Sequence, residues 1–370
     1  IGGIGTIIVV LLVVLVLLAN VLPLFRNSRI DLASEISLSK LSSEAVGNEA
    51  VGKFLAFGSD EYCELAWLVR PDQSLDVYCL ATGEQIQRST PPNVAEGSKP
   101  IRATAARIDD QQSSVLLGLE DGSIRIVLCT IDVSFASKSD LDRELAQEID
   151  ARDGLPVLRD QTIYRATSEG LIRKVSFGGA QYIDPIPVHS GAIENIDWVF
   201  KTDGSLMASS QKGAWASSAA GELAMGQFER QAGGLGSEPK QSVQMWQTKL
   251  DSQPTIQGLM LSGLWDSLQS VDATGSVSRW SPEGSGTLKR VENYKTLTAQ
   301  LSALSATEPL LGRSTLMLGN QSGELEAVSL TTSESGRELR TIHKIGCSDA
   351  SIRAIASSPT QRLVAVADKV

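Results

Sequence analysis

The sequence predicts an all-β fold behind one N-terminal transmembrane helix, and three observations lead to that prediction. The first 25 residues are almost entirely apolar. Strand–turn–strand units then recur at nearly constant intervals from Phe54 onward. Within these units apolar and polar residues alternate with the period of two that half-buried strands require, as Ile124, Ile126 and Leu128 illustrate.

The apolar segment Ile1–Phe25 is long enough to cross a membrane. Eighteen of its 25 residues are Ile, Leu, Val or Phe, and the first charge is Arg26. A bilayer core needs roughly 20 such residues, whereas the apolar region of a cleaved signal peptide has about 7–15. We therefore expect an uncleaved transmembrane helix over residues 1–25, in contact with lipid. Residues 26–53, rich in Ser, Glu and Ala, read as a linker.

Residues 54–370 contain the repeat. Its six hairpin units place a turn at equivalent positions separated by 48, 48, 43, 62 and 48 residues. Five of the six positions are Gly, which reaches the positive φ that tight hairpins need. The Gly-rich stretch Gln231–Gln241 accounts for the long interval. The expected turn positions are Ser74, Gly122, Gly170, Gly213, Gly275 and Gly323.

A second turn follows the hairpin in many units, at Ala81–Ile86, Ala219–Ala224 and Ser333–Leu339, and we assign it to the connection between a third and a fourth strand. A first strand precedes the hairpin in several units, as in IRATAARI and TIQGLMLS. Four short strands per ~48 residues is the spacing of a β-propeller blade of the WD40 or quinoprotein type. The spacing favours it over a β-sandwich or a β-helix.

We expect seven such blades, the last incomplete. LVAVADKV overlays the start of an earlier unit, and its turn glycine would follow the last residue, Val370. The chain also starts without Met, so we expect a fragment of a longer protein, truncated at the C-terminal end of its propeller.

Ser139–Asp153 is charged and favours a helix, with Leu141, Leu145 and Ile149 on one face. We read it as a solvated helical insertion between blades, begun by Ser139, and a role in partner binding stays open.

Composition excludes several classes of function. The net charge of −10 without a basic tract argues against nucleic-acid binding. Four cysteines without C-x-x-C spacing and two distant histidines, His189 and His343, argue against a metal site. A Cys63–Cys79 disulfide stays possible if the domain is extracytoplasmic. The five tryptophans from Trp198 to Trp280 fit packing between blades.

Catalytic and cofactor motifs are missing from the sequence. It contains no nucleophile elbow, Walker A or kinase motif, and the Asp–Gly pairs at residues 121 and 203 are typical of turns. SVDATGSVSRW at Ser270–Trp280 looks like the repeat of quinoprotein-like propellers, but it occurs once and brings no cofactor site. We expect no enzyme and no cofactor; an extracytoplasmic quinoprotein-like enzyme is the least favoured alternative.

GGIGTIIVVLLVVLVLLANVLPLF at Gly2–Phe25, followed directly by such a domain, resembles the long permease subunit of bacterial phosphate (Pst-type) ABC transporters. The resemblance implies a first membrane helix followed by a periplasmic insertion, in an inner-membrane protein whose partners are other transporter subunits or envelope proteins. It carries over no functional residue. Arg26 and Arg29 by themselves favour a cytoplasmic domain.

The acidic net charge would repel phosphate over the whole surface. If the resemblance holds, we expect the propeller to dock proteins or to regulate transport, and not to collect phosphate. The alternative is a single-span, membrane-anchored propeller scaffold for envelope protein assembly, and membrane spans encoded beyond Val370 would separate the two.

Overall fold

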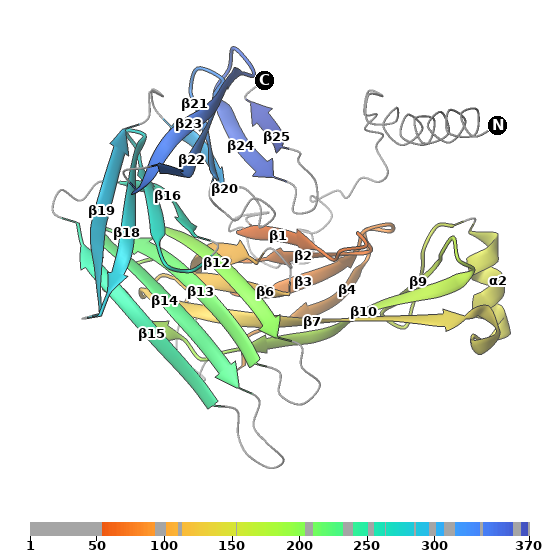
Figure 1. Cartoon of the computed structure of the whole chain (residues 1–370). Helices are drawn as coiled ribbons and strands as arrows, with labels where there is room; N and C mark the ends of the chain where they lie inside the picture. The colour runs from red at the N-terminus through yellow and green to blue at the C-terminus, as the bar shows by residue number, and fades with distance from the viewer. Residues whose placement is uncertain are drawn as a thin grey trace, which may run out of the picture. The chain divides into compact units, whose positions relative to one another are not determined.

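The computed structural model describes residues 54–92, 101–109, 113–152, 154–203, 210–231, 240–250, 255–262, 264–284, 286–295, 301–306, 315–333, 336–357 and 364–368. The expected transmembrane helix (residues 1–25) and linker (26–53) lie outside these ranges. Among the described residues no helix is long and apolar enough to span a membrane. The described part is all-β, built from successive antiparallel sheets (Figure 1).

The first two sheets come from residues 56–187. The first sheet contains β1 (Ala56–Ser59), β2 (Leu65–Val69), β3 (Leu75–Cys79) and β4 (Gln85–Ser89) in sequence order. The second sheet contains β5 (Ala103–Ile108), β6 (Ser114–Leu119), the long β7 (Ser123–Ser137) and β10 (Leu171–Tyr182), with the short β11 (Ile186–Pro187) also paired to β7.

The remaining sheets repeat this meander. The third sheet contains β12 (Asn195–Asp203), β13 (Ser210–Ala219), β14 (Glu222–Gln231) and β15 (Lys240–Lys249). The fourth contains β16 (Ile256–Leu261), β17 (Leu268–Asp272), β18 (Ser276–Glu283) and β19 (Thr287–Lys295), joined to the third by one parallel pairing, Gln247 with Thr287. The fifth contains β20 (Leu301–Ala306), β21 (Thr315–Asn320), β22 (Glu324–Ser333) and β23 (Gly336–Gly346). The sixth is a pair, β24 (Ile352–Ser357) and β25 (Val364–Asp368).

Among the described residues, four hydrophobic cores lie between successive sheets. Trp67 and Leu117 belong to the core between the first and second sheets. Leu116 on the other face of β6 meets Trp198 and Trp215 of the third sheet. Further cores fill the spaces between the third and fourth and between the fourth and fifth sheets. Strands β6 and β17 are therefore buried on both faces, and the tryptophans pack between sheets as predicted.

The hairpin between the second and third strands is built the same way in four sheets. An Asp or Asn side chain accepts bonds from the backbone N–H and the hydroxyl of the residue two positions on, and this turn chemistry fixes the hairpin. The pairs are Asp72 with Ser74, Asp121 with Ser123, Asp272 with Thr274, and Asn320 with Ser322. Gly122, Gly275 and Gly323 lie in these turns with φ of +82, +78 and +78°.

Three of the expected turn assignments need correction. Gly213 lies inside β13, where a Cβ would come within 2.3 Å of the Trp198 ring, and the turn of the third sheet is at Gly221. The stretch Ala219–Ala224 therefore joins the second and third strands. In the first sheet Gln73, with φ of +66°, has the place of the glycine, one residue before Ser74.

The unit at Gly170 is not a sheet of its own. Its turn, with φ of +79°, joins two strands of an insertion in the second sheet. The described strands therefore form six successive units, the last with two strands, and not the seven blades expected from spacing alone. The insertion itself is about as long as one repeat, which explains the error.

Candidate functional site: an inserted arm

The insertion, residues 131–177, is called the arm. It leaves the second sheet where Thr130 of β7 pairs with Gly179 of β10, at a β-bulge. Beyond that point β7 and β10 continue together toward α2 (Arg143–Ala151), and β10 also pairs with β9 (Thr162–Ala166), which pairs with β8 (Val157–Arg159) (Figure 1). A 3-10 turn, η3 (Lys138–Asp140), precedes the helix.

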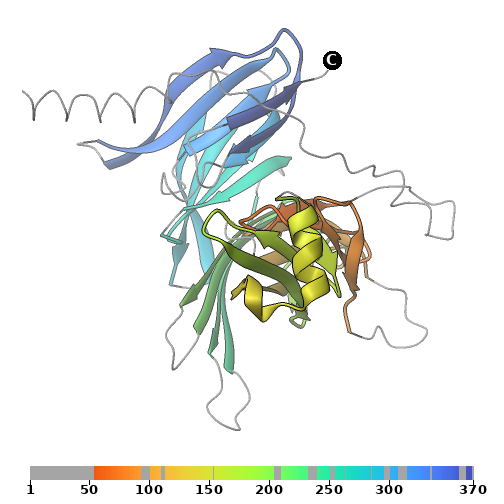
Figure 2. The same cartoon turned by 90° about the vertical axis from the view of Figure 1, so that its right-hand side faces the viewer.

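Helix α2 covers one face of the arm's strands (Figure 2). Leu145 and Ile149 of α2 are buried against Val157 and Ile172. The helix begins after Asp142, whose side chain accepts from the backbone N–H of Leu145 at 2.8 Å. Asp142, and not Ser139, is therefore the N-cap. In the chain, the helix is inserted between β7 and β10, which are strands of the same sheet. The expectation of an insertion between blades is therefore corrected.

The opposite face of the arm packs on the first sheet. Ile163, Val175 and Phe177 join the core that contains Trp67 and Val77. This shared core ties the arm to a sheet that precedes it by about a hundred residues in the chain.

A buried carboxylate strengthens this attachment. Glu64, at the start of β2, is 2% exposed and accepts from Arg165 at 3.2 Å and from Arg173 at 2.6 Å. The Arg173 guanidinium also lies 4.2 Å from the centre of the Tyr62 ring. Two arm cations thus neutralise one carboxylate of the first sheet, which stabilises one orientation of the arm.

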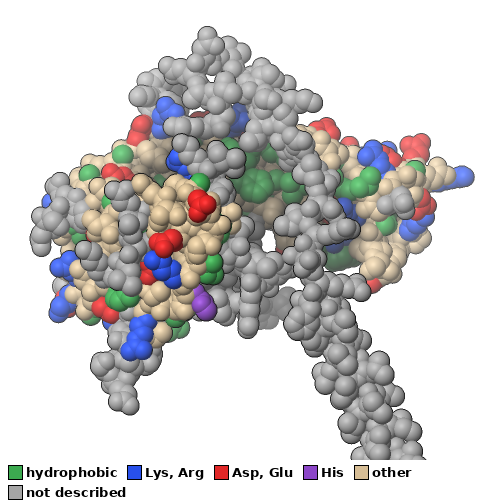
Figure 3. Space-filling view, turned by 90° about the horizontal axis from the view of Figure 1, so that it is seen from above, with side chains coloured by type: hydrophobic (Ala, Val, Ile, Leu, Met, Phe, Trp, Pro, Cys, Tyr) green, Lys and Arg blue, Asp and Glu red, His purple; other side chains and the backbone are tan. Residues whose placement is uncertain are grey.

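The far part of β7 has an open edge. β6 pairs with β7 only as far as Leu128, and from Thr130 to Ser137 β7 pairs with β10 alone among the described strands. Val133 and Phe135 on this edge are 38% and 53% exposed. Side chains of both charges lie over the arm when the molecule is seen from above (Figure 3). Sequence reasoning missed this edge because only the pairing reveals where β6 ends.

A second polar cluster surrounds His189, next to a small cavity lined also by Gln247 and Lys249. The His189 ring lies 2.8 Å from the Ser217 hydroxyl through Nε2 and 3.3 Å from Glu222 through Nδ1. Burial lowers the pKa of His189, although Glu222 opposes that shift. Partial burial would raise the pKa of Glu222, but hydrogen bonds from Ser190 and His189 lower it overall.

The order Ser–His–Glu invites comparison with a hydrolytic triad. Ser217, however, is 0% exposed, inside β13. A nucleophile must reach its substrate, so this arrangement has a structural role: it fixes the connection from β11 to β12 over the third sheet. The sequence contained no signal for it, because the three residues come from separate segments.

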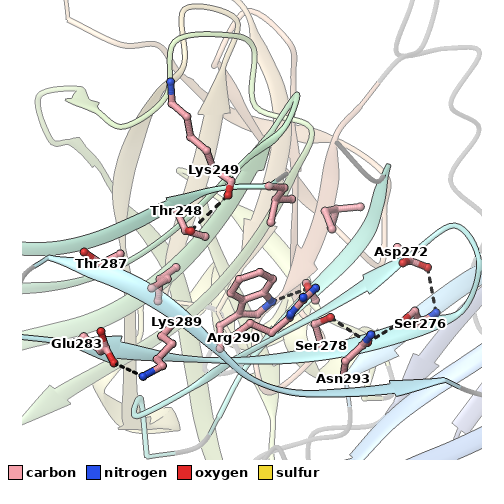
Figure 4. A pocket seen from close by; sticks show the side chains of 15 residues that line it. Thr248, Lys249, Asp272, Ser276, Ser278, Glu283, Thr287, Lys289, Arg290 and Asn293 are labelled. Atoms are coloured by element: carbon pink, nitrogen blue, oxygen red, sulfur yellow. Dashed lines mark hydrogen bonds and ion pairs between the residues drawn. The ribbon is translucent and has the colours of Figure 1, made fainter. Parts of the chain in front are cut away.

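The larger cavity, of about 550 Å³, lies where the third and fourth sheets meet (Figure 4). Its polar side chains are largely engaged with one another. Lys289 pairs with Glu283 at 3.1 Å. Asn293 accepts from Ser276 and Ser278, and the Trp280 indole donates to Ser270 at 2.8 Å. Arg290 lies over the Trp280 ring.

No group of three His, Cys, Asp or Glu side chains that could hold a metal ion occurs within the ranges that the structure covers. Cys63 and Cys79 are both free thiols, so the disulfide considered from the sequence is not present. Asp272–Gly275 of the quinoprotein-like stretch forms an ordinary hairpin turn.

The chain matches no protein-family model, and the search of curated proteins returns no match.

Proposed function

We propose that the strand-rich part of this chain is a β-propeller domain whose arm docks another protein. The support for the propeller is the contact between first strands: β5 with β1 and β12, β16 with β12 and β20, and β20 with β24. Asp197 of β12 illustrates it, since its carboxylate accepts from the Leu261 N–H at 2.7 Å and lies 3.5 Å from Arg107. Radially repeated four-stranded sheets are the architecture of propeller blades.

The observation that carries the docking role is the open edge of the arm. A fixed sheet edge with exposed Val133 and Phe135 has both features of a strand-addition site, namely backbone groups that no described strand pairs with and apolar side chains. The Glu64 ion pairs keep this edge in one orientation. Preorganisation of this kind lowers the entropy lost when a partner binds.

The chain as a whole is, in this proposal, the N-terminal part of an inner-membrane permease of a phosphate-type ABC transporter. The sequence of residues 1–25 supports it, through its length, its apolar composition and the resemblance described above. The docking domain lies in the periplasm and contacts transporter subunits or envelope proteins.

The test compares two matched double variants of the full-length protein in its native membrane. Val133→Ser with Phe135→Ser alters the edge, and Leu264→Ser with Val291→Ser alters two exposed apolar residues elsewhere. We expect the first to reduce co-purification of partner subunits about 30-fold, the effect of losing a hot spot of about 2 kcal/mol. The second should leave it unchanged.

Equal recovery of partners from both variants would contradict the docking role. The transporter assignment is tested separately, by phosphate uptake in cells with and without the gene and by the coding sequence beyond Val370. If phosphate uptake is unchanged without the gene and the coding sequence beyond Val370 encodes no further apolar spans, the permease assignment fails. The protein would then be assigned as a membrane-anchored scaffold.

A further inference from the structure

The order of residues along the open edge of β7 suits pairing with a second, identical strand. Its exposed residues alternate between the two faces of the arm, with Val133 and Phe135 on one face and Asp132 and Ser134 on the other. In an antiparallel pair of two identical strands centred on Ser134, Val133 of one copy is directly opposite Phe135 of the other, twice. Aromatic and β-branched residues in opposite positions stabilise a pair of strands.

The charges of the edge favour the same arrangement. Asp132 lies on the face of Ser134, and Lys138 follows on that side just past the end of the strand. In the antiparallel pair Asp132 is opposite Ala136 and diagonal to Lys138 of the other copy. A parallel pair would place Asp132 against Asp132, which is repulsive. Lys138 now pairs with Asp150, but both are exposed, so this ion pair is weak and exchangeable.

We propose that the arm binds a second copy of this chain, by antiparallel pairing of the two β7 edges about a two-fold axis at Ser134. The proposal rests on the docking role of the arm and identifies the docked subunit as another copy of the same chain. Such an interface is isologous, so it closes with two copies and does not propagate into a filament. It also covers the edge that would otherwise attract unrelated strands.

Cross-linking through one introduced thiol tests this geometry in the full-length protein in native membranes. Residues opposite each other in an antiparallel pair have Cα atoms about 4.5–5.5 Å apart, within the range of a disulfide. The Ser134→Cys variant should therefore link to a second copy of itself under mild oxidation. The exposed cysteines Cys63 and Cys347 are first replaced by Ser, while Cys79 and Cys129 are buried and remain.

Ser139→Cys is the matched control, because Ser139 is also exposed on the arm but lies beyond the strand. We expect the Ser134→Cys variant to form a reducible homodimer at least ten times faster than the Ser139→Cys variant. Adding Phe135→Asp to the Ser134→Cys variant should abolish the link by removing the apolar contact at the interface.

The alternative outcomes separate this inference from the docking role. Equal dimer yields from the two thiol variants would show random collision and overturn the two-fold pairing. A disulfide between the Ser134→Cys variant and a different protein would overturn self-pairing while leaving the arm a docking site. Absence of any adduct would overturn self-pairing as well, and the double variant Val133→Ser with Phe135→Ser would still decide whether the arm docks at all.

Discussion

The turns at Gly122 and Gly170 are alike in local sequence and different in surroundings. LEDGSIRIV and TSEGLIRKV each contain an acidic residue, the glycine and an alternating strand, and the glycines have φ of +82 and +79°. At Gly122 the connection between the second and third sheets covers the turn, and the N–H groups of Val188 and His189 both donate to the Gly122 carbonyl. At Gly170 a Cβ would meet nothing within 4 Å.

The Gly122 arrangement recurs at Gly323, which accepts from Cys347 and Ser348 in the connection to the sixth unit. A Cβ on Gly122 would lie 2.2 Å from the His189 carbonyl oxygen, and one on Gly323 would lie 1.9 Å from the Ser348 carbonyl oxygen. The repeated sheets are thus joined by close backbone approach, whereas the arm is attached by side chains. The same turn sequence serves both, and only its neighbours distinguish them.

Alanine substitution of the two glycines should produce the largest difference in stability between the two turns. Gly122→Ala adds a left-handed strain of about 1–2 kcal/mol and a clash with backbone of about 1–3 kcal/mol, so we expect about 2–5 kcal/mol of destabilisation. Gly170→Ala should cost only the strain. Urea unfolding of both variants measures the difference, and equal losses would contradict a covered turn at Gly122.

Glu64→Gln should have the next largest effect, because it leaves two arm arginines without their carboxylate. Breaking a fully buried pair costs about 3–5 kcal/mol. Here Arg165 is 34% exposed, so we expect about 1–3 kcal/mol. Hydrogen exchange should rise in β9 and β10 more than in β20–β23. The neighbouring exposed Glu61→Gln is the control and should change neither quantity.

The smallest expected effect is a pH dependence at the covered turn. The folded pKa of His189 is below its ordinary value, so the unfolded chain binds more protons as the pH falls through ~6.5. The free energy of unfolding should therefore decline from pH 7 to 5. Glu222 is the acidic group facing His189. Its pKa is lowered, so its titration changes the free energy of unfolding in a more acidic pH range.

His189→Gln keeps a hydrogen-bonding side chain and should flatten this decline. His343→Gln should preserve it, because His343 is exposed on β23. An identical pH profile for wild type and His189→Gln, measured by urea unfolding at each pH, would exclude His189 as the origin.

The all-β class, the first strands and most hairpin turns follow from local features of the sequence. These depend on neighbours in the chain: alternation gives a strand two faces, and Asp–Gly–Ser favours a turn through its own local hydrogen bonds. The stretches IRATAARI and TIQGLMLS accordingly contain β5 and β16. The turns at Gly122, Gly275 and Gly323 follow from the same local chemistry.

Which hairpins belong to the same sheet depends on contacts between distant segments of the chain. The turn at Gly170 belongs to the arm because β10 pairs with β7, some forty residues away in the chain. The local alternation of apolar and polar residues does not predict this pairing. Gly213 is predicted as a turn glycine but lies inside a strand. A residue without a side chain is required there because the Trp198 ring packs against it. The Glu64 attachment and the open β7 edge arise from contacts between distant segments, and such contacts exist only once the chain has folded.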